Sequence, residues 1–275
     1  MHVRLWLIPH LLVATFVVSC ATAPYTHRSQ FNVLPESEEN SLGLQAYKEV
    51  LTKEKIDHNG TTIDPVRDVG QRIARAADKP DYKWEFNVID DPKTVNAFAL
   101  PGGKIAVYTG LFPVAHDTAG LAAVLGHEVG HALAHHAAER MSQNLVLQML
   151  ATGASMTLGG SNPATQSALM QALGLGAQVG VLLPFSRTQE AEADHIGLIL
   201  MAKAGYDPHA ALELWHRFET VEKNSPPEFL STHPAYGTRE KNIESWMPEA
   251  MGYYQQANVK VELLPPIQGA KEAAR

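Results

Sequence analysis

The sequence contains almost no cysteine and has no surplus of positive charge. Cys20 is the only cysteine in 275 residues, so the chain cannot form an intramolecular disulfide. Its 22 basic residues are outnumbered by 29 acidic ones, giving a net charge of −7. No basic stripe is available to neutralise phosphates, so we expect no nucleic-acid partner. With 45% hydrophobic and 19% charged residues, the composition is typical of a globular protein.

The N-terminus has the features of a targeting segment. Arg4 precedes an almost wholly apolar run over residues 5–18, which predicts a signal peptide over residues 1–19. The sole cysteine, Cys20, follows directly and resembles the lipobox of bacterial lipoproteins, in which that cysteine is lipidated. An ordinary signal peptide with an incidental cysteine is the alternative. Because Ala21 is not the aspartate that retains many lipoproteins in the inner membrane, we expect a lipid anchor in the periplasm at the outer membrane.

The remaining pattern predicts an α+β fold in which helices outnumber strands. Residues 20–37 show no period and are expected to be a lipidated N-terminus and tether, followed by one domain over 38–250 and a tail over 251–275. We expect a small antiparallel sheet, whose last two strands are joined by Pro-Gly-Gly at 101–103. The predicted strands cover residues 84–89, 95–100 and 104–108, and the predicted helices cover 42–51, 64–77, 118–149, 187–205, 207–223 and a short segment ending at 246.

The sequence His-Glu-Val-Gly-His at residues 127–131 indicates a metal site on a helix. Residues four apart share one helical face, so His127 and His131 can bind one Zn²⁺ together. Glu128 points beside the metal, where it can act as general base on a zinc-bound water. A pair of hydrogen-bonded histidines on a core helix is the alternative. Gly126 and Gly130 are poor helix formers, so we expect another backbone to approach closely there.

A catalytic zinc normally has a third protein ligand. His135 lies two turns beyond His127, roughly 12 Å along the axis, which is too far to bind the same ion. We expect His135 and His136 to form a pair at the helix end, on the surface. Glu190 and Asp194 share one face of a later predicted helix, so one can bind zinc while the other holds a ligand histidine by its second ring nitrogen.

These residues resemble the motifs of the M48 family of metallopeptidases, particularly its bacterial periplasmic members. The resemblance spans about residues 40–246 and includes Asn-Ala-Phe-Ala-Leu-Pro-Gly-Gly at 96–103 and His-Pro at 233–234. It implies a zincin-like domain, mainly helical, with one Zn²⁺ per chain. It also implies a role for each matching residue. The ligands are His127, His131 and Glu190, the base is Glu128, the supporting residues are Asp194 and Arg239, and His233 is an oxyanion donor or an inhibitory zinc ligand.

Two segments are expected to handle the substrate. The strand containing Asn96, Ala97, Phe98 and Ala99 is predicted to be a sheet edge that pairs with extended polypeptide, with a buried hairpin as the alternative. Residues 141–186 contain no Asp, Glu, Lys, Arg or His. We expect either a cover over the active site or a helical hairpin packed on the core. A transmembrane hairpin is disfavoured because its first half is too short and its second half is too polar.

The expected activity is that of a zinc metalloendopeptidase. We expect its substrates to be misfolded or unassembled proteins of the bacterial envelope, because the predicted leader directs the chain to that compartment. The first rival interpretation is an envelope chaperone or assembly lipoprotein with little proteolysis. A hydrolase of cell-wall peptides ranks lower, because nothing in the sequence resembles a peptidoglycan-binding module.

Overall fold

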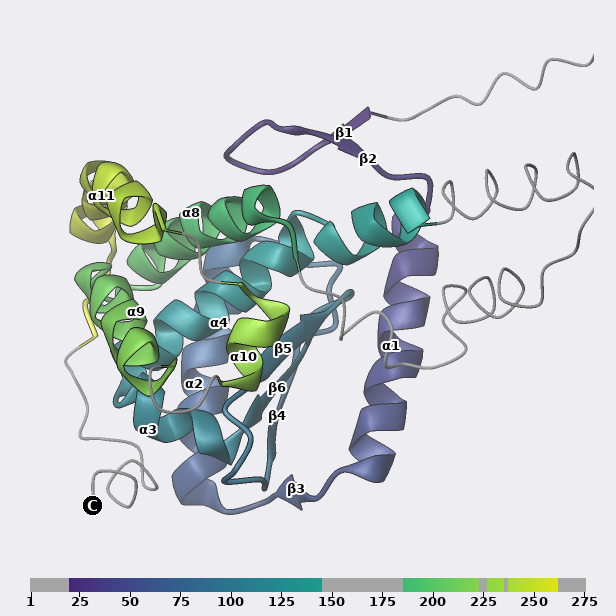
Figure 1. Cartoon of the computed structure of the whole chain (residues 1–275), viewed down its shortest axis with the longest axis horizontal. Coiled ribbons are helices and arrows are strands. Elements are labelled where there is room, and N and C mark those ends of the chain that lie inside the picture. Colours follow the sequence, from purple (N-terminus) through teal and green to yellow (C-terminus); the bar gives the residue numbers. More distant parts are fainter. Residues whose placement is uncertain (1–19, 145–184, 223–226, 235–236, 262–275) are drawn as a thin grey trace, which may run out of the picture.

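The structure, a computed structural model, describes residues 20–144, 185–222, 227–234 and 237–261. It confirms an α+β fold that is mainly helical, with a small sheet against a group of helices (Figure 1). The strands are β1 (Cys20–Thr22), β2 (Ser29–Phe31), β3 (Ile56–Asp57), β4 (Glu85–Ile89), β5 (Ala97–Leu100) and β6 (Lys104–Tyr108). The helices are α1 (Glu36–Lys53), α2 (Gly60–Ala77), α3 (Phe112–Ala115), α4 (Thr118–Leu133), α8 (Arg187–Lys203), α9 (His209–Glu222), α10 (Glu228–Thr232) and α11 (Arg239–Gln256), with a 3₁₀ turn at Thr109–Leu111.

The larger sheet has the strand order β3-β4-β6-β5. β5 and β6 form the expected antiparallel hairpin, whose turn contains Gly102 and Gly103 at φ of 79° and 81°. β4 and β6, however, pair in parallel, so the expectation of an antiparallel sheet is wrong and the sheet is mixed. The hairpin places its second strand next to β4, which leaves β5 outermost among the described strands. The edge position predicted for β5 is therefore confirmed there, although its side chains are mostly buried.

Helices cover both faces of this sheet. On one face, Tyr47 of α1 packs with Phe98, Leu100 and neighbouring side chains, and its hydroxyl donates to the carbonyl of Ile105. On the other face, the larger core joins β4 and β6 to α2, α4 and the C-terminal helices. α4 also borders β5, so the edge strand and the helix of the predicted metal motif lie side by side.

Two helices differ from their expected limits. α2 begins at Gly60, where Asn59 caps the Thr61 N–H, and Pro65 lies inside the helix instead of opening it. The long helix expected to follow Thr118 is interrupted after Leu133, and residues 136–144 are helical again. His135, at φ 49°, makes this interruption. The change of direction alters which side chains reach the site.

The segment expected to be a tether contains an ordered hairpin. β1 and β2 pair antiparallel above α8 and α4 (Figure 1), and Ala23 between them is buried in the main core. Residues 20–31 of the expected tether therefore contain regular secondary structure, which the sequence pattern did not predict. At the other end, α11 extends to Gln256, into the expected tail. The predicted signal peptide and nearly all of the uncharged stretch, residues 145–184, lie outside the described residues.

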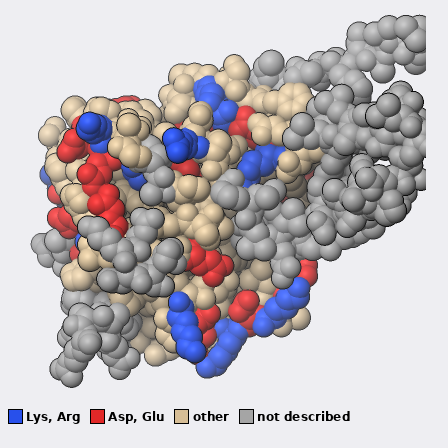
Figure 2. All heavy atoms as spheres, in the orientation of Figure 1, with Lys and Arg blue, Asp and Glu red and all other residues tan. Residues whose placement is uncertain are grey.

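The described surface carries both signs of charge. Figure 2 shows acidic and basic side chains on the face in view, with acidic ones gathered toward its left side. Within the described part of the chain, no helix has the length and apolar character needed to span a membrane.

Candidate metal centre

The close packing of α4 against α8 positions the site. A Cβ atom on Gly126 would lie 2.7 Å from the carbonyl oxygen of Gly197, and one on Gly130 would lie 2.8 Å from that of Ala193. Real Cβ atoms essentially never come this close, so only glycine allows the two backbones to approach. The predicted close approach at Gly126 and Gly130 is thus confirmed. It brings Glu190 of α8 within reach of the two histidines of α4.

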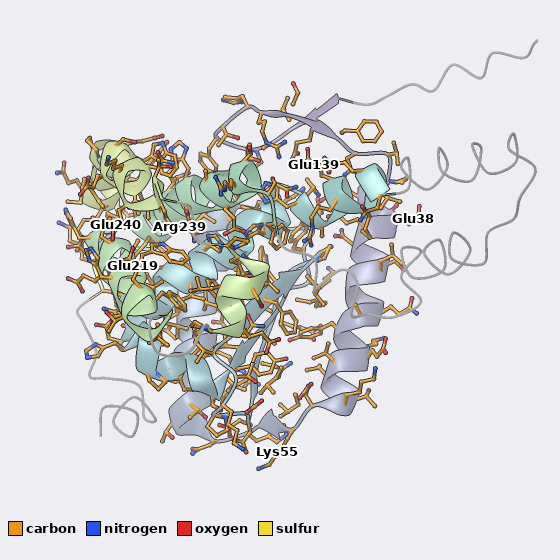
Figure 3. The ribbon with its side chains drawn as sticks, viewed as in Figure 1. Glu38, Lys55, Glu139, Glu219, Arg239 and Glu240 are labelled. Atoms are coloured by element: carbon orange, nitrogen blue, oxygen red, sulfur yellow. The ribbon has the colours of Figure 1, made fainter. Side chains whose placement is uncertain are left out.

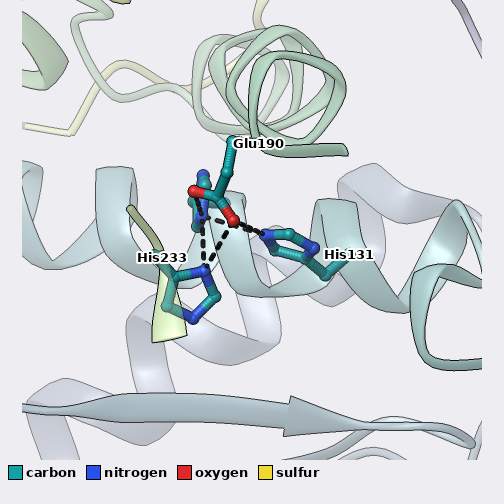
Figure 4. Close-up of side chains that lie close together, drawn as sticks. His131, Glu190 and His233 are labelled. Carbon is teal, nitrogen blue, oxygen red and sulfur yellow. Dashed lines mark hydrogen bonds and ion pairs between the residues drawn. The ribbon is translucent and has the colours of Figure 1, made fainter. Parts of the chain in front are cut away.

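Four buried side chains converge at this contact. His127, His131, Glu190 and His233 each present one possible ligand atom, and these atoms lie within 4.8 Å of one another. The Nε2 atoms of His127 and His131 are 3.1 Å apart, and they lie 3.6 and 3.4 Å from oxygens of Glu190. Figure 4 shows His131, Glu190 and His233 pointing toward one common point from three separate elements. Helical spacing had predicted His127 and His131, and the family resemblance had added Glu190 and His233.

The donor set fits a cation. His127 Nδ1 lies 2.8 Å from the Asp194 carboxylate, which can only accept, so Nδ1 carries a proton, and the neutral ring has its lone pair on Nε2. Burial holds the pKa of His131 well below its ordinary value, so this ring is neutral and can bind a metal. Two nitrogen lone pairs and a carboxylate repel one another unless a cation lies between them. Three ligands of these types are what catalytic zinc uses.

Asp194 and Arg239 hold the ligand residues in place by hydrogen bonds. Arg239 Nε donates to Asp194 Oδ2 over 2.6 Å, and its Nη2 donates to Glu190 Oε2 over 2.7 Å. Burial alone would raise the pKa of Asp194, but the charge of Arg239 and the hydrogen bond from His127 hold it below the ordinary value. Arg239, labelled in Figure 3, begins α11 and reaches two carboxylates of α8. The structure therefore brings together both residues that were expected to support the ligands.

Glu128 lies between the ligand set and the edge strand. Its Oε2 accepts a hydrogen bond of 3.0 Å from the backbone N–H of Ala99, and its Oε1 lies 3.3 Å from His233 Nε2. Burial raises the pKa of Glu128 above its ordinary value, although the neighbouring His233 and His127 oppose this shift. A carboxylate with a raised pKa beside a metal site is suited to take up and return a proton near neutral pH.

His233 enters the site at the end of α10. The Phe229 N–H donates to the carbonyl of Val95, which ties this short helix to the segment leading into β5. His233 Nδ1 lies 3.3 Å from His127 Nε2 and 3.1 Å from Glu190 Oε1. In this conformation one ring nitrogen faces the ligand set and the other faces Glu128. The position is compatible with both roles that the sequence left open.

The position of His136 differs from the prediction, and its partners were not predicted. His136 was expected on the surface but is fully buried, with Nδ1 2.8 Å from His131 Nδ1 and Nε2 2.8 Å from Glu192 Oε2. It reaches His131 only because the helix breaks at residues 134–135, and a continuous helix would direct the two side chains apart. Arg28, which pairs with Glu192, is distant in sequence, and no local pattern could have indicated it.

Comparisons with known proteins agree with this geometry. The model of peptidase family M48 matches residues 63–247. The chain is 37% identical over 255 residues to the mitochondrial metalloendopeptidase OMA1 of Schizosaccharomyces pombe, covering 90% of this chain and 73% of that protein. It is 30% identical to human metalloendopeptidase OMA1, with 90% of this chain and 50% of the relative covered. The beta-barrel assembly-enhancing protease of Escherichia coli O157:H7 is 25% identical, with coverage of 80% and 46%.

The family model includes the whole metal centre, from the two histidines of α4 to Arg239 of α11. The buried group His127, His131, Glu190 and His233 fits the zinc that M48 peptidases use. On the match over residues 63–247 and the likeness to metalloendopeptidases over most of its length, this chain belongs to peptidase family M48 and is a zinc metalloendopeptidase.

Proposed function

We propose that the protein cleaves misfolded or unassembled proteins of the bacterial envelope. The observation that carries this proposal is the hydrogen bond between the Ala99 N–H and Glu128, which joins a sheet edge to the general base beside the ligand set. An edge strand binds extended backbone with little demand on side chains. Unfolded proteins offer such backbone, whereas folded ones do not.

His127, His131 and Glu190 are the proposed zinc ligands, and each has a clear supporting contact. Zinc held by these residues would activate a water molecule and polarise the scissile carbonyl. Glu128 is placed to take a proton from the attacking water and to return it to the leaving amine. Asp194 keeps the Nδ1 proton on His127, and Arg239 holds Asp194 and Glu190 in place. All of these groups are buried.

We assign His233 to two positions. With Nδ1 facing His127 and Glu190, its ring would serve as an additional zinc ligand in a resting state. Moved away from the ligand set, its ring can donate to the oxyanion that develops during attack. The second role requires His233 to move, and its place at the end of a five-residue helix suits a small displacement.

The proposed substrate strand runs along β5. The N–H of Ala99 turns away from β6 toward Glu128, and the N–H of Ala97 bonds only locally, to Asn96 Oδ1. These groups lie on the free edge, because β5 pairs only with β6 in the described sheet. A bound peptide aligned with Asn96, Ala97, Phe98 and Ala99 would place a carbonyl next to Glu128.

The proposed location is the bacterial periplasm, with an anchor to the outer membrane through lipidated Cys20. The apolar segment over residues 5–18 and the single cysteine at its end support a lipoprotein leader. The relative in Escherichia coli is named for enhancing β-barrel assembly, which favours envelope proteins as clients. The similarity to mitochondrial relatives supports the same peptidase domain. The proposed compartment therefore rests on the N-terminal leader.

A trapping experiment tests the proposal. Glu128→Gln should keep its zinc and capture substrates without cutting them, while the wild-type protein digests unfolded casein. Captured proteins should be unassembled envelope proteins, and His131→Ala serves as the control for adventitious binding. Capture of folded cytoplasmic proteins would refute the substrate class. Capture of envelope proteins by a wild type that cuts none of them would favour the chaperone alternative.

A further inference from the structure

We propose that His136 and Glu192, held by Arg28 of the N-terminal hairpin, are positioning residues that fix the protonation pattern of the zinc ligand His131. They form a second support for the site, separate from Asp194 and Arg239. The inference rests on the proposed assignment of His131 as a ligand.

The side chains of His131, His136 and Glu192 form one buried series of contacts. His131 Nδ1 lies 2.8 Å from His136 Nδ1, and His136 Nε2 lies 2.8 Å from Glu192 Oε2. His136 is completely buried, and Glu192 is 5% exposed, so water does not compete for these bonds. The ring of His131 therefore contacts a hydrogen-bond partner on the side opposite its Nε2 atom.

Glu192, the last acceptor in this series of hydrogen bonds, determines which ring nitrogens of His136 and His131 carry protons. The ionised carboxylate of Glu192 can only accept, so His136 must carry its proton on Nε2. A neutral imidazole then has a lone pair on Nδ1, which accepts the Nδ1–H of His131. His131 consequently has its lone pair on Nε2, the atom that faces His127 and Glu190. The opposite tautomer of His131 would place a proton where the metal must bind.

Arg28 and its partners hold the carboxylate in this position. Arg28 Nε donates to Glu192 Oε2 over 2.8 Å, and both terminal nitrogens of Arg28 donate to Glu139 over 2.8 Å. Thr26 also donates to Glu192, and Gln189 donates to Glu139 over 2.9 Å. Figure 3 places Glu139 directly below the β1–β2 hairpin. A planar guanidinium bonded to two carboxylates fixes both more strictly than a flexible lysine would.

This arrangement connects the N-terminal hairpin to the metal centre. Thr26 and Arg28 lie in the turn between β1 and β2, only a few residues after Cys20. Loss of the hairpin contact would free Glu192 and, through His136, would weaken the preference of His131 for the metal-binding tautomer. Zinc affinity should then depend on a segment that never touches the zinc.

The experiment measures zinc affinity of the full chain in detergent by competition with a chromophoric chelator. His136→Leu, which cannot accept the His131 proton, should bind zinc about 10–100-fold more weakly than wild type. His136→Gln should retain most of the affinity, because one amide can accept from His131 and donate to Glu192. Arg28→Met should show a smaller loss. His195→Leu is the control, since His195 lies on α8, the helix that carries Glu192, and pairs instead with Glu249.

Two further readouts separate positioning from simple stabilisation. The thermal midpoint in chelator reports folding without metal, and a merely structural role would lower it equally for both His136 variants while leaving zinc affinity unchanged. Long-range proton–nitrogen NMR on the zinc-loaded wild type reports the ring tautomers directly. The proposal requires Nδ1–H on His131 and Nε2–H on His136, and it is overturned if either ring shows the opposite tautomer.

Zinc binding by folded His136→Leu at wild-type affinity would also overturn it, as would equal losses in His136→Leu and His136→Gln. Should His136→Leu fail to fold, the wild-type tautomers and Arg28→Met still decide the matter. His131→Ala distinguishes this failure from a failure of the ligand assignment. If His131→Ala retains full zinc affinity, then His131 is not a ligand. If His131→Ala loses zinc affinity while His136→Leu keeps it, His131 is a ligand and only the positioning role of His136 is wrong.

Discussion

Gly197→Ala tests whether the contact between α4 and α8 sets the geometry of the zinc site. The added Cβ would lie 2.7 Å from the His127 backbone nitrogen and 2.9 Å from its Cα atom. Neither atom can move like the end of a flexible side chain. Ordinary contacts begin near 3.4 Å, so the two helices must separate by about 0.7 Å at this point. Glu190 on α8 would move away from His127 and His131 on α4.

Gly197→Ala should weaken zinc binding more than it lowers the free energy of unfolding. Overpacking typically costs about 1–3 kcal/mol, and the better helix propensity of alanine returns roughly 1 kcal/mol. The free energy of unfolding without metal should therefore fall by on the order of 1 kcal/mol. Metal–ligand distances, in contrast, tolerate only about 0.2 Å, so a shift of this size should weaken zinc binding by at least tenfold.

The assay compares Gly197→Ala with Gly252→Ala. Gly252 lies in α11, and a Cβ there would meet nothing within 4 Å, so this control should melt at or above the wild-type temperature. Zinc affinity is measured by chelator competition and activity by casein cleavage. If Gly197→Ala binds zinc and cleaves casein like Gly252→Ala, the close helix contact does not determine the geometry of the zinc site.

Three other changes have defined outcomes. Asp194→Asn should lower zinc affinity by roughly 10–100-fold, because an amide is a weaker acceptor for His127 and leaves Arg239 less well paired; unchanged affinity in chelator competition would contradict this. Removing zinc with a chelator should lower the thermal midpoint of the wild type, by the equivalent of about 4 kcal/mol at a free zinc concentration 1,000 times its dissociation constant, while His131→Ala should not respond. Ala97→Pro removes a backbone donor from the free edge of β5, so it should raise KM for casein without loss of zinc, and normal kinetics would exclude β5 as the substrate strand.

The parts of the site that follow from local geometry could be predicted from the sequence. Helical spacing placed His127 and His131 on one face, with Glu128 beside them. The same argument paired Glu190 with Asp194, and the unfavourable glycines in α4 predicted a close backbone contact. Each of these inferences depends on residues within one or two turns of one another. The resemblance to a known family was needed to choose Glu190 as the ligand and to include His233 and Arg239.

The parts that depend on tertiary contacts could not be predicted. His136 is buried because His135 interrupts the helix, and the sequence gives no cap or proline at that point. Arg28 acts across 164 residues of sequence, and its hairpin lacks the alternating apolar pattern of a predicted strand. The parallel pairing of β4 with β6 depends on strand order, which the strand patterns themselves do not specify.

In the assigned metal centre, His127, His131 and Glu190 hold zinc, while Glu128 acts on the substrate without holding the metal. Zinc content per chain and casein cleavage, measured together in Glu128→Gln and Glu190→Gln, separate these two roles. Glu128→Gln should contain one zinc per chain and cleave casein more slowly by several orders of magnitude. Glu190→Gln should lose most of its zinc and its activity. Full zinc content in Glu190→Gln, or loss of zinc from Glu128→Gln, would show that these roles are wrongly assigned.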